Sequence, residues 1–306
     1  MTAAKTRGPG GSWLESLAGS PLPWLLPLAA ILVATFVFPI FEIVRLSFTD
    51  ASLVGGGYEY TLGSYASLLG SPYFLDMLTA TAIFVFASVF FQMLLGFLIA
   101  LVVDQGARRG MRSSIVTRTA VLSAWAIPGV IIGIIWSILY QQSEVGILNY
   151  ILGLVGIGPI PFLSDPEFAL ASVTVANIWR GTAFSMILIY AGLQTLPEDV
   201  LEAAKVDGAN AFQSLTRVVL PLLAPILFIN LVIVSIETFN TFDMVLALTG
   251  GGPGRATEVI ALSIYNQIFQ QFDLGPGAAT AVLLLAVNAV MTVVYIRLLQ
   301  REEEVA

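Results

Sequence analysis

Two charged residues, Arg180 and Glu237, lie within long apolar stretches of this 306-residue sequence. A charged side chain at the centre of a bilayer costs about 2.5 kcal/mol or more on insertion scales, so both residues are candidates for function. Glu237 belongs to a polar stripe along one helical face, since its neighbours recur at helical spacing. The other members of the stripe are Asn230, Val234, Thr238 and Thr241, with Asn240 and Asp243 beside it. Such groups would bind the hydroxyl groups of a solute, and a nearby ring such as Phe184 would stack on its C–H face.

Arg180 and Glu237 also allow a structural interpretation. They fall near the middle of two consecutive apolar segments, so their opposite charges would meet at matching depth if those segments are antiparallel helices. An ion pair of this kind would fix the rotation of the helices without touching a solute. Both interpretations stay open at this point.

The composition excludes the common kinds of enzyme. The sequence has no Cys and no His, which removes disulfides, thiolates, the commonest metal ligand and the commonest general base. We therefore predict no catalytic residue and no metal ligand. The residues that give the net charge of −7 are divided between acidic loops and basic loops. We predict no nucleic-acid partner.

The hydropathy predicts an all-α integral membrane protein. With 57% hydrophobic and 11% charged residues and a mean hydropathy of +0.89, the chain is too apolar for a soluble globule. A span needs about 20 apolar residues, and only helices satisfy every backbone amide within lipid. Six segments qualify, at about 24–48, 78–103, 114–140, 168–193, 221–247 and 278–299.

The distribution of Lys and Arg predicts the orientation. Most of the 13 basic residues fall on one side, the side of the N-terminus, the 104–118 loop, the 195–221 segment and the C-terminus. Because cytoplasmic loops are rich in Lys and Arg, we place that side in the cytoplasm. The chain then divides into a cytoplasmic segment 1–22, a transmembrane domain 23–300 with a hairpin at 195–220, and a cytoplasmic tail 301–306. We interpret the 104–118 loop as an orientation signal that meets anionic lipid.

Residues 195–221 predict a helical hairpin outside the lipid. Thr195 and Glu198 have the spacing of a capping box, and Gly208 suits a left-handed turn after the first helix. Asn210 and Gln213 would open a second short helix that ends at Leu220-Pro221. The small residues of the hairpin would let another protein's backbone approach closely, which predicts a docking surface. An amphipathic hairpin on the membrane surface, with no partner, is the alternative.

Two outer loops have different characters. The 141–167 loop predicts a short surface helix over Ile147–Val155, whereas the 49–77 loop is expected to be irregular. The Gly-rich 249–254 loop lacks a following Gly-Lys-Ser/Thr and is not a phosphate loop.

The hairpin also carries a family resemblance. Glu202-Ala203-Ala204, followed after three residues by Gly208-Ala209 and then by Leu220-Pro221, resembles the EAA loop of permease subunits in bacterial ATP-binding-cassette (ABC) importers. The resemblance implies six transmembrane helices with a cytoplasmic coupling hairpin, the type I ABC importer permease fold. It also implies a coupling helix that sits in a cleft of an ATPase subunit. The implied coupling residues are Glu202, Ala203, Ala204, Asp207 and Gly208.

Two further motifs resemble the sugar-importing branch of that family. They are Leu193-Gln194-Thr195-Leu196-Pro197 before the hairpin and Leu248-Thr249-Gly250-Gly251-Gly252-Pro253 after the fifth span. The resemblance implies that the second motif faces a substrate-binding protein through Gly250, Gly251, Gly252 and Pro253, although a plain turn is the alternative. The implied sugar-binding positions are Arg180, Gly181, Phe184, Val234, Glu237, Thr238 and Thr241. Arg180 and Glu237 are more charged than the maltose-permease pattern.

The resemblance implies a transport subunit and not an enzyme. The sugar would be a disaccharide such as trehalose, since the chain also resembles the trehalose importers of mycobacteria. The implied partners are a second homologous permease subunit, a dimer of ATPase subunits, an extracellular or periplasmic sugar-binding lipoprotein or soluble protein, and membrane lipid. ATP and Mg²⁺ would be bound by the ATPase, with no cofactor in this chain. The implied location is the bacterial plasma membrane, and the implied mechanism is alternating access.

Two rival functions use the same carboxylates. In an ion-coupled secondary transporter, Glu237 and Asp243 would be proton or sodium sites, but that class needs internal repeats and broken helices. Six spans with one hairpin do not predict these features. In a membrane-embedded enzyme, Glu237 and Asp243 would have to act together, and their spacing of six residues does not place them on one helical face.

Overall fold

The computed structural model describes residues 22–143 and 146–303, and over these residues it is helical apart from two isolated β-bridges. The predicted all-α class is confirmed. The predicted N-terminal segment 1–22 lies outside the described residues except for Leu22, and the tail 301–306 is described only to Glu303. The structure tests neither the cytoplasmic location of these ends nor the orientation of the chain.

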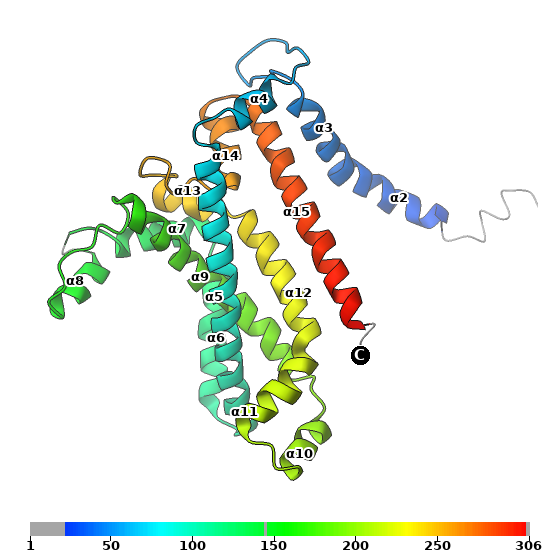
Figure 1. Cartoon of the computed structure of the whole chain (residues 1–306), viewed down its shortest axis with the longest axis vertical. Coiled ribbons are helices and arrows are strands. Elements are labelled where there is room, and N and C mark those ends of the chain that lie inside the picture. Colours follow the sequence, from blue (N-terminus) through cyan, green and yellow to red (C-terminus); the bar gives the residue numbers. More distant parts are fainter. Residues whose placement is uncertain (1–21, 144–145, 304–306) are drawn as a thin grey trace, which may run out of the picture.

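Five helices of the described chain are each long and apolar enough to cross a membrane. The first is assembled from α2 (Leu22–Leu32), a π-helical turn (Val33–Val37) and α3 (Phe38–Ser47). The others are α5 (Phe74–Arg108), α9 (Pro166–Leu193), the continuous helix Ala211–Phe239, and α15 (Leu274–Glu303). In Figure 1, α5, α9 and α12 run side by side, whereas α2 projects away from them.

The predicted third span, 114–140, is not one helix. It consists of α6 (Arg112–Ala126) and α7 (Gly129–Leu139), which meet at an angle of 102°. The break follows from Pro128, because proline disfavours the helical conformation of the preceding residue. Ile127 accordingly has extended angles, with φ −78° and ψ 129°.

The predicted fifth span, 221–247, is displaced at both ends. The helix begins at Ala211 with α11 (Ala211–Ser214) and passes through a π-helical turn (Leu215–Val219) into α12 (Leu220–Phe239). The second hairpin helix therefore does not end at Leu220-Pro221, and it continues into the span. The helix ends at Phe239, and a separate helix, α13 (Asp243–Thr249), follows.

The first helix of the hairpin is α10 (Glu198–Val206). Its N-cap is Pro197, without a side-chain cap, so the predicted Thr195–Glu198 capping box is wrong. The Thr195 hydroxyl instead donates to the Gly192 carbonyl at 2.8 Å, which satisfies an end group of α9. The other two hairpin signals are confirmed. Gly208 has φ +79°, and Asn210 and Gln213 form a reciprocal capping box.

The connecting segments contain three further helices. The 141–167 loop holds the predicted surface helix as α8 (Ile147–Leu154). The 49–77 loop was expected to be irregular but contains α4 (Gly63–Leu69), and α14 (Ile260–Tyr265) follows the Gly-rich loop. The ends of the molecule are distinct, since α4 and α14 lie at one end and α10 and α11 at the other (Figure 1).

The core is built around the contact between α5 and α9. Gly96 of α5 lies against Ser185 of α9 so closely that a Cβ on the glycine would be 2.5 Å from the serine Cβ. Gly192 likewise leaves room for Ile226 of α12. Small residues allow such close helix packing within a membrane. These contacts fix the rotation of α5, α9 and α12, and therefore the direction in which their polar side chains point.

Candidate binding cavity

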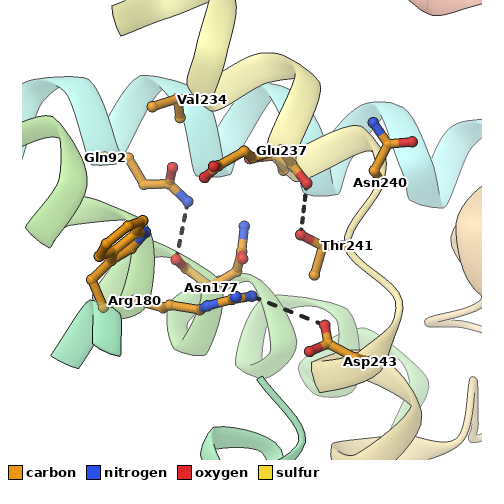
Figure 2. A pocket seen from close by; sticks show the side chains of 11 residues that line it. Gln92, Asn177, Arg180, Val234, Glu237, Asn240, Thr241 and Asp243 are labelled. Atoms are coloured by element: carbon orange, nitrogen blue, oxygen red, sulfur yellow. Dashed lines mark hydrogen bonds and ion pairs between the residues drawn. The ribbon is translucent and has the colours of Figure 1, made fainter. Parts of the chain in front are cut away.

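A cavity of about 370 Å³ lies where α5, α6, α9, α12 and α13 meet, within the size range of small-molecule sites. Figure 2 shows the side chains that line it. They are Gln92, Trp125, Asn177, Arg180, Gly181, Val234, Glu237, Thr238, Asn240, Thr241 and Asp243. The lining supplies amide, hydroxyl, carboxylate and guanidinium groups together with one large aromatic ring.

Six of the seven predicted binding positions line this one cavity. Phe184 is the exception, since it packs against the apolar core and places its ring centroid 5.7 Å from that of Trp125. The aromatic surface of the cavity therefore comes from Trp125 of α6, with Phe184 behind it. The structure brings the predicted residues together, and their contact with a solute stays a prediction.

Arg180 forms its ion pair with Asp243 and not with Glu237. The Arg180 Nη1 and Asp243 Oδ1 atoms are 4.0 Å apart, as Figure 2 shows. The structural interpretation, an ion pair between Arg180 and Glu237, is therefore wrong. The break after Phe239 explains the change, because it turns the chain so that Asp243 begins a new helix beside α7. A Cβ at Gly129, the first residue of α7, would overlap the Asp243 carboxylate, so a larger residue there would displace the Asp243 side chain.

The Glu237 carboxylate has no hydrogen-bond or ion-pair partner within the described residues. Its backbone carbonyl accepts from Thr241 Oγ1 at 2.9 Å, which keeps Thr241 on the same face although the helix has already ended. The ionised side chains of the cavity are then one guanidinium and two carboxylates. The cavity carries a formal charge of −1, and the charge without a partner is negative.

Three lining residues were missed by the sequence analysis: Gln92, Trp125 and Asn177. Gln92 Nε2 donates to the Asn177 carbonyl at 3.0 Å, and a Cβ at Gly181 would overlap the Gln92 amide. The Asn177 side-chain nitrogen is buried without a hydrogen-bond partner. Amides within apolar helices were the available signal, because polar residues at membrane depth are functional candidates just as charges are.

The predicted coupling residues lie on the outside of the hairpin. Glu202, Ala203, Asp207 and Gly208 are exposed, and Ala204 is half-buried. A Cβ at Gly208 would meet nothing within 4 Å. Two large apolar side chains are also exposed here, Val206 at 86% and Phe212 at 73%. Much of this surface is therefore open to a partner.

Side-chain hydrogen bonds hold the Gly-rich loop in place. Gly250 and Gly251 have φ of +61° and +95°, which favour glycine. Thr257 is fully buried, and its hydroxyl lies 2.7 Å from that of Thr249 and donates to the Gly252 carbonyl at 2.9 Å. These bonds present Gly250, Gly251, Gly252 and Pro253 as a fixed surface, whose partner stays a prediction.

Comparison with known proteins adds three findings. Residues 92–303 match the family described as binding-protein-dependent transport system inner membrane component. The trehalose/maltose transport system permease protein MalF of Thermococcus litoralis is 32% identical over 89% of this chain and 91% of its own length. The trehalose transport system permease protein SugA of Mycobacterium tuberculosis is 30% identical over 89% of this chain and 86% of its own length.

A solved structure has the same fold. It is a bacterial ABC transporter involved in the import of the acidic polysaccharide alginate, with a TM-score of 0.82 over 95% of this chain and 99% of that chain. At 21% sequence identity, this likeness establishes the fold alone. The predicted type I importer permease fold is confirmed.

Proposed function

The chain belongs to the family of binding-protein-dependent transport system inner membrane components, and on this premise we propose that it is the permease subunit of an ATP-driven importer of a neutral disaccharide such as trehalose. It is a transport subunit and not an enzyme, and a separate subunit hydrolyses ATP. The observation that carries the proposal is the single cavity that six predicted sugar-binding positions line together.

The charge of the cavity favours a neutral cargo. Arg180 is paired with Asp243, so no unpaired cation lines the cavity among the described residues, and Glu237 adds an unpaired carboxylate. A phosphate, sulfonate or uronate group would meet repulsion that a low-dielectric site makes stronger. Sugar hydroxyls can instead donate to Glu237 and accept from the free Asn177 amide, while Trp125 stacks on the ring.

The hairpin supports coupling to an ATPase dimer on the cytoplasmic side. Its small and exposed residues, from Glu202 to Gly208, leave room for a partner's backbone. The neighbouring Val206 and Phe212 are apolar anchors that would be buried on docking. ATP and Mg²⁺ bind the partner, and the movement reaches the cavity as alternating access.

Further partners follow from two surfaces that the chain leaves open. The first span, Trp24–Ser47, has no buried residue in its most apolar window, which favours a second, homologous permease subunit and lipid as its neighbours. The fixed loop Gly250–Pro253 would face a sugar-binding protein outside. The complex would lie in a bacterial plasma membrane, with both termini in the cytoplasm.

An ion-coupled secondary transporter is the alternative. It requires broken helices, and the described chain has one bent pair of helices, α6 and α7 at Pro128. The family match nevertheless favours ATP as the energy source.

The test is uptake of labelled trehalose by proteoliposomes that contain the assembled complex and its binding protein. We expect uptake to require ATP inside the vesicle and to survive collapse of the proton and sodium gradients. Labelled sn-glycerol 3-phosphate, of comparable polarity but anionic, is the cargo control and should not accumulate. Uptake driven by an ion gradient without ATP would refute the proposal, and accumulation of the phosphate would refute the neutral cargo.

A further inference from the structure

Four polar side chains join the ends of α5 and α9 to the first turn of α10. Arg108 Nε donates to Asp104 Oδ2 at 2.8 Å, and Arg108 Nη1 lies 3.6 Å from Glu198 Oε1. The other carboxylate oxygen of Asp104 accepts a hydrogen bond from Gln194 Nε2. Arg108 Nη2 also donates to the Leu193 carbonyl at 3.4 Å, at the end of α9 where carbonyls lack helical partners.

Asp104 is the buried centre of this network. It is only 7% exposed, next to the buried Ala100 and Val103. A carboxylate removed from water in this way depends on its partners, because loss of Arg108 or of Gln194 leaves an uncompensated polar group. The Glu198 side chain, by contrast, is 82% exposed, and exposed pairs contribute little to stability. Asp104 therefore holds the ends of α5 and α9 in place. The contact between Glu198 and Arg108 can change at little cost in stability.

The network lies on the direct route from the hairpin to the cavity. Gln92 and Asp104 belong to one uninterrupted helix, α5, and are about 18 Å apart along its axis at 1.5 Å per residue. Gly96 locks that helix against Ser185 of α9, and α9 carries Arg180. A turn of α5 and α9 at Asp104 would therefore move two walls of the cavity together.

We propose that Asp104 is a positioning residue for energy coupling. Through Gln194 and Arg108 it sets the angle of α10 to α5 and α9, so that displacement of the hairpin turns the helices that line the cavity. This inference rests on the proposed function, because it takes the hairpin as the contact with the ATPase. Asp104 itself touches neither the solute nor the ATPase.

The experiment measures transport and hydrolysis in the same vesicles. Asp104→Asn keeps an acceptor for Gln194 but removes the charge that holds Arg108. In the complex with ATPase and binding protein, we expect this variant to retain ATPase co-purification and basal hydrolysis. The sugar transported per ATP should fall by roughly five- to tenfold, the low end of typical coupling between sites. Asp104→Glu should restore most of the ratio.

The matched control is Glu42→Gln, which removes the 2.8 Å ion pair with Arg45 on α3, far along the chain from the hairpin. It should leave the ratio unchanged. If Asp104→Asn prevents insertion, Glu198→Gln tests the exposed end of the network and should lower the ratio about twofold. Equal losses of uptake and hydrolysis, with a constant ratio, would show a merely structural role. Failure of the unmodified chain to bind the ATPase would instead overturn the proposed function.

Discussion

The Arg180 guanidinium lies 4.0 Å from the Asp243 carboxylate, which joins α9 to α13 at the edge of the cavity. This pair leaves Glu237 as the carboxylate without a partner among the described lining residues. One carboxylate thus holds a helix in place, whereas the other faces the space that a solute would occupy. Substitution of Glu237 and substitution of Asp243 should therefore have different effects.

Glu237→Gln should weaken sugar uptake without weakening assembly. Gln keeps a neutral acceptor, and a hydrogen bond to a charged group exceeds a neutral one by about 1–1.5 kcal/mol, so the apparent affinity for the sugar should fall by about five- to tenfold. The measurement is the concentration dependence of uptake together with ATPase co-purification. Glu59→Gln, on an exposed loop, is the control of equal chemistry. Loss of the whole protein in Glu237→Gln alone would favour a structural role.

Asp243→Asn should change the selectivity of the cavity. It removes the negative partner of Arg180 and brings the formal charge of the lining from −1 to zero. An anionic solute can then accept hydrogen bonds from the free guanidinium. We expect sn-glycerol 3-phosphate to inhibit trehalose uptake at a concentration about tenfold lower than with the unmodified chain. If sn-glycerol 3-phosphate inhibits the variant and the unmodified chain at the same concentration, Arg180 does not face the solute.

Gly208→Trp should abolish uptake while leaving insertion intact. The position has φ +79° and open space around its Cβ, so the chain itself can hold the ring and only a docked partner would clash with it. Gly110 has φ +68° and equally open space, which makes Gly110→Trp the matched control. In both variants the left-handed backbone conformation costs the new tryptophan about 1–2 kcal/mol. Equal uptake in the two variants would argue against docking at Gly208.

Glu202→Arg should loosen the complex with the ATPase. Glu202 is exposed on α10, so its reversal leaves the chain's own packing intact. Rim charges act mainly on association rate and salt dependence. Co-purification should therefore fall most at low salt, where screening is weak. If the variant recovers as much ATPase as the unmodified chain at every salt concentration, Glu202 does not lie in the interface.

The sequence predicted the features that depend on local composition. Apolar stretches must become helices in lipid, so the class and most spans were found from hydropathy alone. The Asn210–Gln213 box and the left-handed turn at Gly208 depend only on neighbouring residues, and both are confirmed. Helical spacing predicted the cavity positions Val234, Glu237, Thr238 and Thr241, and a charge at membrane depth predicted Arg180, whereas Gly181 came from the family resemblance.

The features that depend on packing could not be predicted in this way. The span predicted over 114–140 took no account of Pro128, where α6 and α7 meet at an angle of 102°. The break after Phe239 has no proline or glycine at Asn240, Thr241 or Phe242, so no local signal announces it. Gln92 and Asn177 reach the cavity because Gly181 and Gly96 set the rotation of α5 against α9, a relation between distant segments.

The bend at Pro128 and the break after Phe239 place two short helices, α7 and α13, against each other, with Gly133 close to Ala247. A long helix must tilt as a whole rod, and its far end then moves with its near end. Two short pieces hinged on their own connections can shift while the rods beside them keep their alignment. The Arg180–Asp243 ion pair is then the contact through which a shift of α13 would reach α9 and the wall of the cavity.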